Sequence, residues 1–554
     1  MSLFDIRRRD GLAREGTFAA GDLVIPTPGI VDIGEVSPSL DAEAGTNVPL
    51  AASAGFVSKY GHAGEGEGVT VVHPHGREAA GHGDLVVVAN WQTALARPHD
   101  FVRYLSALKE RIPPDTAWFA PGSALPSTAA LLAYAGFDLF DHRAVDLEAA
   151  QGSFCLSDGV FPIDLADSGA CTCEGCAAGD IGLHNRLALE RELALVRWHI
   201  AQGRLRDLVE ARCRSDPRQV AILRLLDHEE SLVEPYAPVA RTVPFLAATA
   251  ESIRRAEVVR FGRRVVERSP PPLHDVAVLL PCSARKPYSS SLSHRKFARA
   301  VRGRAHELIV TSPLGLVPRE LERVYPAAHY DVPVTGHWDR EELALISSVI
   351  AGHLGRHPYR RVIAHLDGGA LGAAKMAAES CGIRLEETAC GSPTDPASLA
   401  ALDAALEGER RRPVDMVRGV LAWQFGVTAD TRGMTVRGRP PQERVERGGR
   451  ILFTLDARTG LLRPTFEGWD LIPEGYRVGI DAFTPKGDIL APGVLSADEG
   501  IREGDEVLVL GEGVMATGRA AMGGPEMRRS RHGVAVKVRK TVSRDGGAVH
   551  PSSR

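Results

Sequence analysis

Residues 275–294 read DVAVLLPCSARKPYSSSLSH, an apolar run that changes abruptly into a polar, serine-rich segment. The run from Asp275 to Leu280 predicts a strand. In open α/β sheets, ligands usually bind at the edge where the parallel strands end. The stretch therefore predicts an α/β fold with a candidate ligand site directly after this strand.

The same alternation of strands and helices continues towards the C-terminus. The pattern predicts a strand at 307–311, a helix at about 339–354, a strand at 361–366 and a helix that opens near Gly369. A proline-rich hinge, SPPPL at 269–273, precedes this region, and an arginine-rich run at 409–412 closes it. We therefore predict a central α/β domain over residues 270–410.

The first 245 residues also alternate between short strands and helices. Examples are a strand at 84–89 (DLVVVA), a helix at about 101–111 and a strand at 116–120. From Asn185 a helix runs to about Gly203, with apolar residues at helical spacing that are expected to pack in the core. Residues 1–245 therefore form a second predicted α/β domain.

Three cysteines of this domain fall within six residues, in the sequence CTCEGCAAGDIGLHN. Cys171, Cys173 and Cys176 with His184 supply three thiolates and one imidazole, which is the ligand set of a closed, tetrahedral structural zinc site. His199 is a rival for the fourth ligand, and three unpaired loop cysteines are the alternative without a metal. We predict one structural zinc ion.

Bulk properties narrow the class of protein. The chain has 554 residues, a formal net charge of −4 and eight cysteines, too few for a disulfide scaffold. No stretch approaches the roughly 20 apolar residues of a membrane span, and the charged start of the chain does not read as a secretory signal. The sequence predicts a cytoplasmic protein without membrane association.

The C-terminal region is rich in short strands separated by glycine and proline, as expected of a small β-barrel. Gly493 and Gly504 are predicted to occupy turns with positive φ. Eight Lys or Arg face two acidic residues between Arg519 and Asp545, so positive charge is local. Candidate RNA contacts are Arg519, Arg528, Arg529, Arg531 and Lys537. A solvated basic face is the alternative.

The loop after the strand at 275–280 combines several kinds of reactive group within fourteen residues: a thiol, an amine, a phenol, hydroxyls and an imidazole. The candidate catalytic residues are Cys282, Ser283, Lys286, Tyr288, Ser291, Ser293 and His294. Binding of phosphate or RNA backbone would explain the lysine and serines but not the whole set. Cys282 could also be a small apolar residue at a strand end.

The N-terminal region resembles archaeal tRNA-guanine transglycosylases. The similarity is carried by CTCEGC with LHN, by IAQGRLRDLVEARCRSDP and by APGSALPSTAALLAYAGFDLFDHRA. It implies a TIM-barrel-like domain with a zinc site. The barrel is expected to be incomplete, because the family's catalytic aspartate segment, which reads like GGLAVGE, is absent. An incomplete barrel of this kind should not exchange bases.

The central loop resembles the archaeosine synthase motif PCSxxKPYxxSxSH, and the segments TSPLGLVPRELE, YDVPVTGHWDREE and AHLDGGALGAAKMAAE resemble the same family. Residues 476–548 resemble a PUA domain, with APGV, GDEVLVL, TGRA and GVAVKV as local signs. Residues 413–475 are assigned to a small α+β domain, for which the sequence indicates no particular chemistry. The predicted architecture is thus multidomain α/β with a C-terminal β-barrel PUA domain.

The resemblance implies a reaction on 7-cyano-7-deazaguanine (preQ0) at position 15 of tRNA. An amine, provided by lysine, adds to the nitrile carbon and gives an amidine. A radical-SAM partner enzyme then cleaves the adduct to archaeosine. The chain itself could form a homo-oligomer.

Two mechanisms remain open at this point. Cys282 could form a thioimidate that the amine displaces, helped by Lys286 or His294. Alternatively the amine attacks directly, while His294 or Tyr288 manages protons. Two other functions also remain open, an active tRNA-guanine transglycosylase and a non-catalytic tRNA-binding subunit.

Overall fold

A computed structural model describes residues 2–36, 65–66, 69–73, 83–89, 91–333 and 336–543. The chain divides into two compact units. The first contains residues 1–238, 479–503 and 520–537, and the second contains residues 239–478, 504–519 and 538–554. The end of the predicted PUA domain, residues 544–548, lies outside the described residues.

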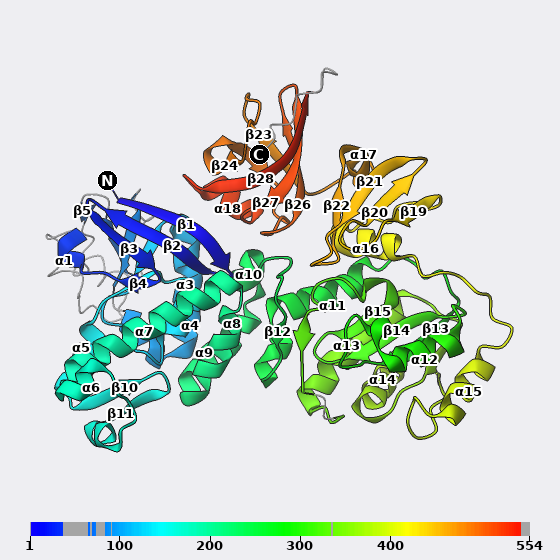
Figure 1. Ribbon diagram of the computed structural model, residues 1–554, viewed down its shortest axis with the longest axis horizontal. Helices are drawn as coiled ribbons and strands as arrows, with labels where there is room; N and C mark the ends of the chain where they lie inside the picture. Colours follow the sequence, from blue (N-terminus) through cyan, green and yellow to red (C-terminus); the bar gives the residue numbers. More distant parts are fainter. Residues whose placement is uncertain are drawn as a thin grey trace. The chain divides into compact units, whose positions relative to one another are not determined.

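A six-stranded sheet, with strand order β4-β9-β8-β7-β6-β5, forms the framework of the first unit (Figure 1). Its strands are β4 (Gly29–Ile30), β5 (Glu65–Gly66), β6 (Val69–Val72), β7 (Leu85–Val88), β8 (Ala117–Phe119) and β9 (Leu139–Phe140). All neighbours are parallel except the pair β5 and β6. The predicted strands at 84–89 and 116–120 are confirmed as β7 and β8.

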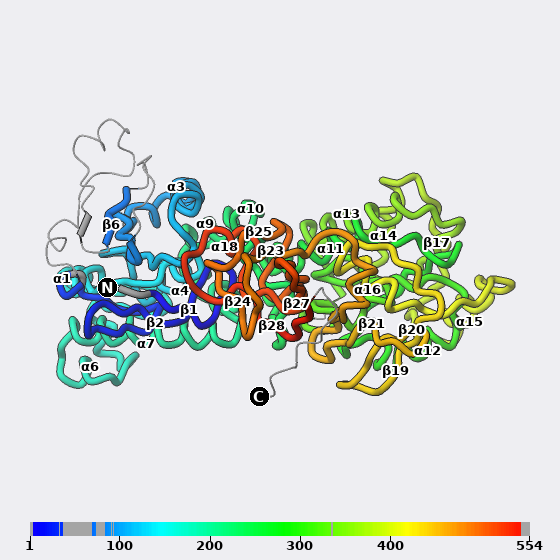
Figure 2. Tube along the Cα trace, turned by 90° about the horizontal axis from the view of Figure 1, so that it is seen from above, coloured from blue at the N-terminus to red at the C-terminus, as the bar shows by residue number. Residues whose placement is uncertain are grey.

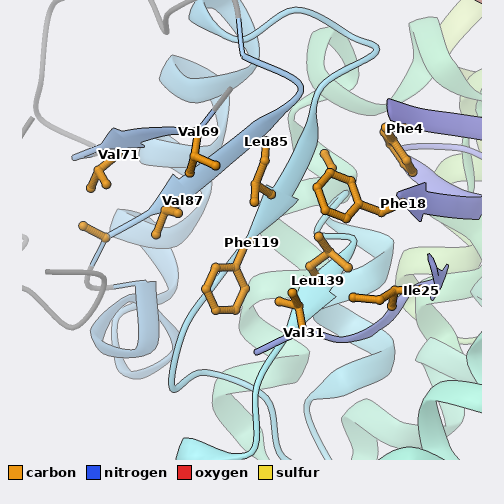
Figure 3. Packing of buried hydrophobic residues seen from close by; sticks show 12 residues of the cluster. Phe4, Phe18, Ile25, Val31, Val69, Val71, Leu85, Val87, Phe119 and Leu139 are labelled. Atoms are coloured by element: carbon orange, nitrogen blue, oxygen red, sulfur yellow. The ribbon is translucent and has the colours of Figure 1, made fainter. Parts of the chain in front are cut away.

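A three-stranded antiparallel sheet covers one part of this parallel sheet. It consists of β1 (Ser2–Asp10), β2 (Ala13–Ala20) and β3 (Leu23–Thr27). Phe4 and Phe18 from the small sheet meet Leu85 and Phe119 from the parallel sheet in one buried cluster (Figure 3). Burial of such large apolar side chains stabilises the unit by about 1.5–3 kcal/mol each.

Helices and one hairpin complete the N-terminal part of this unit. They are α1 (Ile33–Val36), α3 (Pro98–Arg111), α4 (Ala129–Tyr134), α5 (Arg143–Ala150), β10 (Ser153–Leu156), β11 (Gly159–Pro162), α6 (Glu174–Ala178), α7 (Ile181–Gln202), α8 (Leu205–Arg212), α9 (Pro217–His228) and α10 (Glu230–Val233). The predicted helix from Asn185 begins four residues earlier, because Asp180 caps the amide of Leu183. It ends where predicted, at Gly203 with φ of 66°.

The central sheet of the second unit has the strand order β15-β14-β13-β17-β18. The strands are β13 (Val276–Pro281), β14 (His306–Thr311), β15 (Gly315–Pro318), β17 (Arg361–Ala364) and β18 (Leu385–Glu387). Only β15 is antiparallel to its neighbour. The chain therefore builds outwards from β13 in one direction and returns to β17 on its other side, which creates a topological switch point between these two strands.

Helices cover both faces of the central sheet. α12 (Leu292–Val301) contacts α15 (Pro396–Ala405) on one face, and α13 (Arg340–Arg356) contacts α14 (Gly368–Cys381) on the other (Figure 2). Side chains alternate accordingly, since Val278 and Leu280 of β13 pack with Phe297 of α12. The predicted strands and helices of this domain are confirmed, and Asp339 begins α13 with a capping box.

The proline-rich segment at 269–273 does not separate the compact units. α11 (Ala256–Arg268), which precedes it, contacts α13 and β15 of the central sheet. The same unit also contains β12 (Phe245–Leu246), which pairs with β16 (Tyr330–Asp331). The segment is therefore a turn within one unit.

A four-stranded antiparallel sheet follows in the second unit, in the order β19-β20-β21-β22. Its strands are β19 (Met434–Arg437), β20 (Arg444–Arg447), β21 (Arg450–Leu455) and β22 (Leu462–Pro464). The helix α16 (Met416–Phe425) precedes the sheet in the sequence, and α17 (Phe466–Trp469) follows it. A mixed α and β composition was predicted for this part of the chain.

The C-terminal strands are β23 (Arg477–Ile480), β24 (Ile489–Leu490), β25 (Val494–Ala497), β26 (Glu506–Gly511), β27 (Val514–Ala520) and β28 (Val534–Ser543), with α18 (Gly524–Arg529) between the last two. Gly504 has a φ of 91°, as predicted, but the prediction of positive φ at Gly493 is wrong. Gly493 lies in a short 3-10 turn, where a side chain would meet the ring of Phe483 at 3.0 Å.

Candidate functional site

The cysteine cluster forms where α6 meets the first turn of α7. One ligand atom each from Cys171, Cys173, Cys176 and His184 lies within 4.8 Å of all the others. Cys173 and Cys176 each approach Nδ1 of His184 to 3.3 Å. Gly175 permits this approach, because a Cβ atom there would lie 2.3 Å from the backbone nitrogen of His184. The rival ligand, His199, does not belong to the group and contacts the carbonyl of Arg204.

The surroundings of His184 fix its ring and leave Nδ1 directed at the thiols. Nε2 donates to the carbonyl of Cys155 at 3.0 Å, and the ring of Phe154 stacks on the imidazole with centroids 3.8 Å apart. Burial lowers the pKa of His184, so the ring is neutral near neutral pH. Asn185 ties the same turn of α7 to the β10–β11 hairpin through the amide of Cys155. Ligating histidines are commonly oriented by such partners.

The spacing of the four groups fits a tetrahedral metal ion. Metal–sulfur bonds of about 2.3 Å imply tetrahedron edges of about 3.8 Å between sulfur atoms. The Sγ atoms of Cys173 and Cys176 are 3.7 Å apart. The donor set and its geometry therefore fit a metal site with three sulfur ligands and one nitrogen ligand.

The serine-rich segment leaves the central sheet at its switch point. Cys282 directly follows β13, and a loop leads to a short 3-10 turn at Tyr288–Ser290 and then to α12. Ser291 begins α12 by accepting a hydrogen bond from the amide of His294 at 3.2 Å. The motif thus occupies the position at which open α/β sheets bind ligands.

Lys286, Tyr288 and Tyr330 form the densest part of this site. Nζ of Lys286 lies 3.8 Å from the centroid of the Tyr330 ring. The hydroxyl of Tyr330 shares a 2.8 Å hydrogen bond with Tyr288 and a 2.6 Å hydrogen bond with Thr311. Burial raises the pKa of both tyrosines, so both phenols remain protonated. The network fixes the aromatic face on which the ammonium rests.

The ionisation of Lys286 responds to its neighbours. Burial lowers its pKa, whereas the charges of Cys282 and Asp331 oppose that effect. Cys282 and Lys286 therefore lie close enough for an electrostatic interaction. An ammonium group in such a position can provide a proton to a reacting group.

His294 is held in a way that does not suit a general base. Nη2 of Arg319 donates to its Nδ1 at 2.8 Å, and the side chain is only 1% exposed. Burial and the charge of Arg319 lower the pKa of His294 to about 3, although the backbone of Pro281 acts in the opposite direction. Arg319 is itself bound by Glu307 at 2.6 Å and Glu322 at 2.7 Å. His294 is thus a neutral support whose basic nitrogen is occupied.

The serines of the motif mostly shape the loop. Ser283 donates to the carbonyl of Arg285 at 2.9 Å, and Ser291 shares a 3.1 Å hydrogen bond with Ser293. These bonds are local, as is typical of serine in turns. The structure therefore brings Lys286 and Tyr288 together near Cys282, while the three predicted serines hold the backbone around them.

The opposite side of the switch point is formed by the loop after β17. His365 is fully buried and contacts Thr388 at 2.9 Å and the carbonyl of Pro393 at 2.7 Å. α14 then starts at Gly368, and the adjacent Gly369 lies against the ring of Trp338, where a side chain would clash at 3.0 Å. Segments that are distant in the sequence therefore meet at this edge.

Several residues of this site were not assigned from the sequence. They are Thr311, Arg319, Tyr330, Trp338 and His365. Each lies within or beside a segment that already resembled the archaeosine synthase family. That resemblance was the available signal, but it does not indicate which side chains face the Cys282 loop.

The predicted RNA-binding arginines near residue 530 do not form a free loop. Arg528 and Arg529 lie in the last turn of α18, and Arg528 contacts Glu499 at 3.0 Å. Arg529 donates to three carbonyls at the end of α3, including that of Ile112 at 3.0 Å. Arg531 binds Asp115, whose pKa falls to about 2, since hydrogen bonds from His532 and Arg531 outweigh burial. These side chains bind within the first unit.

The other two predicted RNA contacts lie on neighbouring strands. Arg519 on β27 contacts Asp456 at 3.1 Å and Glu506 at 3.6 Å. Lys537 on β28 is exposed. Arg519 is therefore oriented by carboxylates, whereas Lys537 faces the solvent.

Known domain families match two parts of the chain. A domain of unknown function (DUF5591) matches residues 258–406, which include the central sheet and the Cys282 loop. The PUA domain matches residues 479–542. None of the described helices is both long and apolar enough to cross a bilayer.

Similar proteins extend over most of the chain. Archaeosine synthase subunit alpha of Methanosarcina acetivorans is 39% identical over 97% of this chain and 99% of its own length. Archaeosine synthase of Haloferax volcanii is 38% identical over 83% of each chain. A tRNA-guanine(15) transglycosylase of Methanothermobacter thermautotrophicus is 29% identical over 79% of this chain and 67% of its own length.

Proposed function

Because the chain belongs to the archaeosine synthase family, we propose that it adds an amine, supplied by lysine, to the nitrile carbon of preQ0 at position 15 of tRNA. The names of its relatives describe enzymes of tRNA modification. The proposal places the chemistry in the Cys282 loop and the recognition of tRNA in the PUA domain.

One observation carries the assignment of the site. Lys286, Tyr288, Tyr330 and Thr311 converge beside Cys282 at the switch point of the central sheet. A thiol can act as the nucleophile towards a nitrile carbon, and an ammonium or a protonated phenol can supply the proton that the nitrile nitrogen takes up. The Cys3His group of the N-terminal unit would place four protein ligands around one ion and leave no coordination position for substrate.

In the proposed mechanism, the Cys282 thiolate attacks the nitrile carbon. A carbon–sulfur bond forms, one π bond of the nitrile breaks, and the nitrile nitrogen takes a proton from the Lys286 ammonium. The amine of the free lysine substrate then adds to the thioimidate carbon. The carbon–sulfur bond breaks and releases the Cys282 thiolate. The amine's proton returns to Lys286, so the net change is addition of N–H across the nitrile without oxidation or reduction.

His294 has a supporting part in this mechanism. At a pKa of about 3 it is neutral under physiological conditions, so it cannot provide a positive charge to the thiolate. Its contact with Arg319 links the start of α12 to Glu307 and Glu322. His294 and Arg319 thereby position the helix that follows the catalytic loop.

We propose that the Cys3His group binds structural zinc. Zinc would be held by Cys171, Cys173, Cys176 and His184, and it would link α6 to α7 and the β10–β11 hairpin. Thiolate and imidazole ligands in a closed tetrahedron are typical of structural zinc. The N-terminal unit would then serve as an incomplete transglycosylase-like scaffold. A radical-SAM partner would complete the pathway by cleaving the lysine adduct.

The proposal is tested with purified chain, preQ0-containing tRNA and lysine, followed by mass spectrometry of the digested nucleosides. We expect a nucleoside heavier than preQ0 nucleoside by one lysine. Without lysine, intact mass analysis should reveal a covalent species that Cys282→Ser cannot form.

Other outcomes favour the alternatives. Direct attack by lysine predicts no covalent species and a nearly fully active Cys282→Ser. Release of guanine from unmodified tRNA would identify a transglycosylase. If the chain is a non-catalytic tRNA-binding subunit, product will form in the presence of its partner enzyme. Substitution of Cys282 or Lys286 will then not change the amount of product.

A further inference from the structure

The domain at 413–475, to which the sequence assigned no chemistry, shares a chain of alternating charges with two C-terminal strands of the second unit. Arg539 on β28 contacts Glu506 at 2.6 Å, and Arg519 on β27 contacts Glu506 at 3.6 Å. Arg519 also contacts Asp456 at 3.1 Å, and Arg463 on β22 binds the same carboxylate. Three guanidinium groups are therefore joined by two carboxylates.

Burial differs sharply between the two signs of charge. Asp456 is 6% exposed and Glu506 is 2% exposed, whereas Arg463, Arg519 and Arg539 are 35–39% exposed. The two carboxylates thus bind the arginines from the buried side and leave the outer side of each guanidinium group open to solvent. Each guanidinium has five N–H donors, so one or two bonds to a carboxylate leave several donors for a ligand on the exposed side.

The turn that follows β21 is held by hydrogen bonds and adds a fourth arginine. Asp456 accepts a hydrogen bond from the amide of Arg458 at 2.9 Å, and the exposed Arg458 offers its carbonyl to His329 at 2.5 Å. Burial tends to raise the pKa of Asp456, but this amide and the guanidinium groups outweigh it and lower the pKa. The carboxylate is therefore ionised and holds the arginines in place near neutral pH.

A cavity of about 310 Å³ lies against this turn. Its wall includes Arg458, Arg463 and Arg519, with Asp456 as the acidic residue and Thr242 and Thr459 as hydroxyl donors. Three positive groups against one negative group leave the cavity with an excess of positive charge. Arginine is well suited to phosphate, because its planar fork forms paired hydrogen bonds with phosphate oxygens.

We infer that Arg458, Arg463, Arg519 and Arg539 form a continuous binding track for the phosphodiester backbone of RNA. The track extends the RNA-binding surface from the C-terminal strands onto the small α+β domain. It rests on the proposed action on tRNA, and tRNA is the occupant to which we commit. Phosphate contacts of this kind position an RNA without reading its sequence.

The test measures the affinity of the full chain for an unmodified tRNA transcript at several salt concentrations. Arg458→Gln combined with Arg463→Gln should weaken binding and reduce the slope of log affinity against log salt by about 0.7–0.9 for each lost phosphate contact. Arg458→Gln alone should give about half of that change, and we expect it to fold normally because the side chain of Arg458 is exposed. Arg444→Gln is the matched control, since Arg444 lies on β20 of the same domain and its side chain is 52% exposed.

Unchanged affinity and slope in the double variant would overturn the inference. So would a result in which adenosine monophosphate binds in an Arg458-dependent manner while tRNA binding is unaffected, because the cavity would then be a mononucleotide site. Neither result bears on the nitrile chemistry, since the transcript contains no preQ0. A wild-type chain that binds tRNA with the expected slope but forms no lysine adduct would instead contradict the proposed function alone.

Discussion

Sulfur atoms occupy two contrasting environments in this chain. In the first unit, Cys171, Cys173 and Cys176 face one another and a neutral imidazole, with all ligand atoms within 4.8 Å. In the second unit, Cys282 follows a central strand, and its charge acts on Lys286 and on the phenol of Tyr288. The neighbours of a thiol, rather than its presence, separate a metal ligand from a candidate nucleophile.

The largest effect is expected when one of the proposed zinc ligands is removed. Cys173→Ala should lose close to one zinc ion per chain and several kcal/mol of stability, because structural zinc contributes directly to folding. Metal content by elemental analysis and thermal unfolding measure the two effects together. Cys282→Ala is the matched control and should retain the metal.

Loss of metal from Cys173→Ala without any loss of stability would show that the cluster is not structural. Equal loss of metal from both variants would remove the distinction between the two groups of thiols.

An effect of intermediate size is expected when Lys286, the proposed proton donor beside Cys282, is replaced. Lys286→Met should slow alkylation of Cys282 and lower the rate of adduct formation by about 10²–10⁴, the usual cost of removing an acid–base group. The ammonium is lost, while tRNA binding should persist. Site-specific mass spectrometry of alkylated peptides and single-turnover kinetics provide the two readouts. Lys296→Met on the exposed side of α12 should match the wild type.

If Lys286→Met retains full activity, the proton donor lies elsewhere. If activity falls but alkylation of Cys282 does not change, lysine attacks the nitrile without help from the thiol.

The smallest expected effect concerns His294, the buried histidine of α12. His294 has a folded pKa of about 3 and an unfolded pKa near 6.5, so the unfolded chain binds the extra proton between these values. Stability should therefore fall as pH decreases from about 6.5, by roughly 1.4 kcal/mol per pH unit at most from this group. His294→Gln, which can still accept from Arg319, should flatten that dependence in chemical denaturation measured from pH 7 to 4.

A steep dependence that survives in His294→Gln would assign the effect to other buried histidines, such as His353 with its pKa of about 3.

Sequence patterns predicted the parts of the fold that depend on interactions between residues close together in the chain. Apolar runs predicted β7 and β13, and helical spacing with Gly203 predicted the end of α7. The cysteine spacing predicted the metal-binding group because a short turn can bring such ligands around one ion. In each case the information lies within about twenty residues of sequence.

Pairings between distant residues could not be predicted in this way. Arg319 occupies the basic nitrogen of His294 from a strand-end loop 25 residues away, and Arg531 is bound by Asp115 from 416 residues away. A basic residue in isolation looks the same whether it binds RNA or a buried carboxylate. Only the three-dimensional neighbours decide between these two roles.

The contacts of residues 529–532 with the N-terminal segment of the first unit also bear on the order in which the chain is made. Asp115 is 2% exposed and receives hydrogen bonds from Arg531 and His532, which the ribosome adds about 300 residues after Pro238. At roughly 5–20 residues per second, the nascent N-terminal unit would wait about 15–60 s for these partners. Until then Asp115 lacks the hydrogen bonds and cations that Arg531 and His532 supply. We therefore expect a chain that terminates early to lack these contacts and to have a less stable first unit, which quality-control proteases would degrade before an incomplete enzyme accumulates.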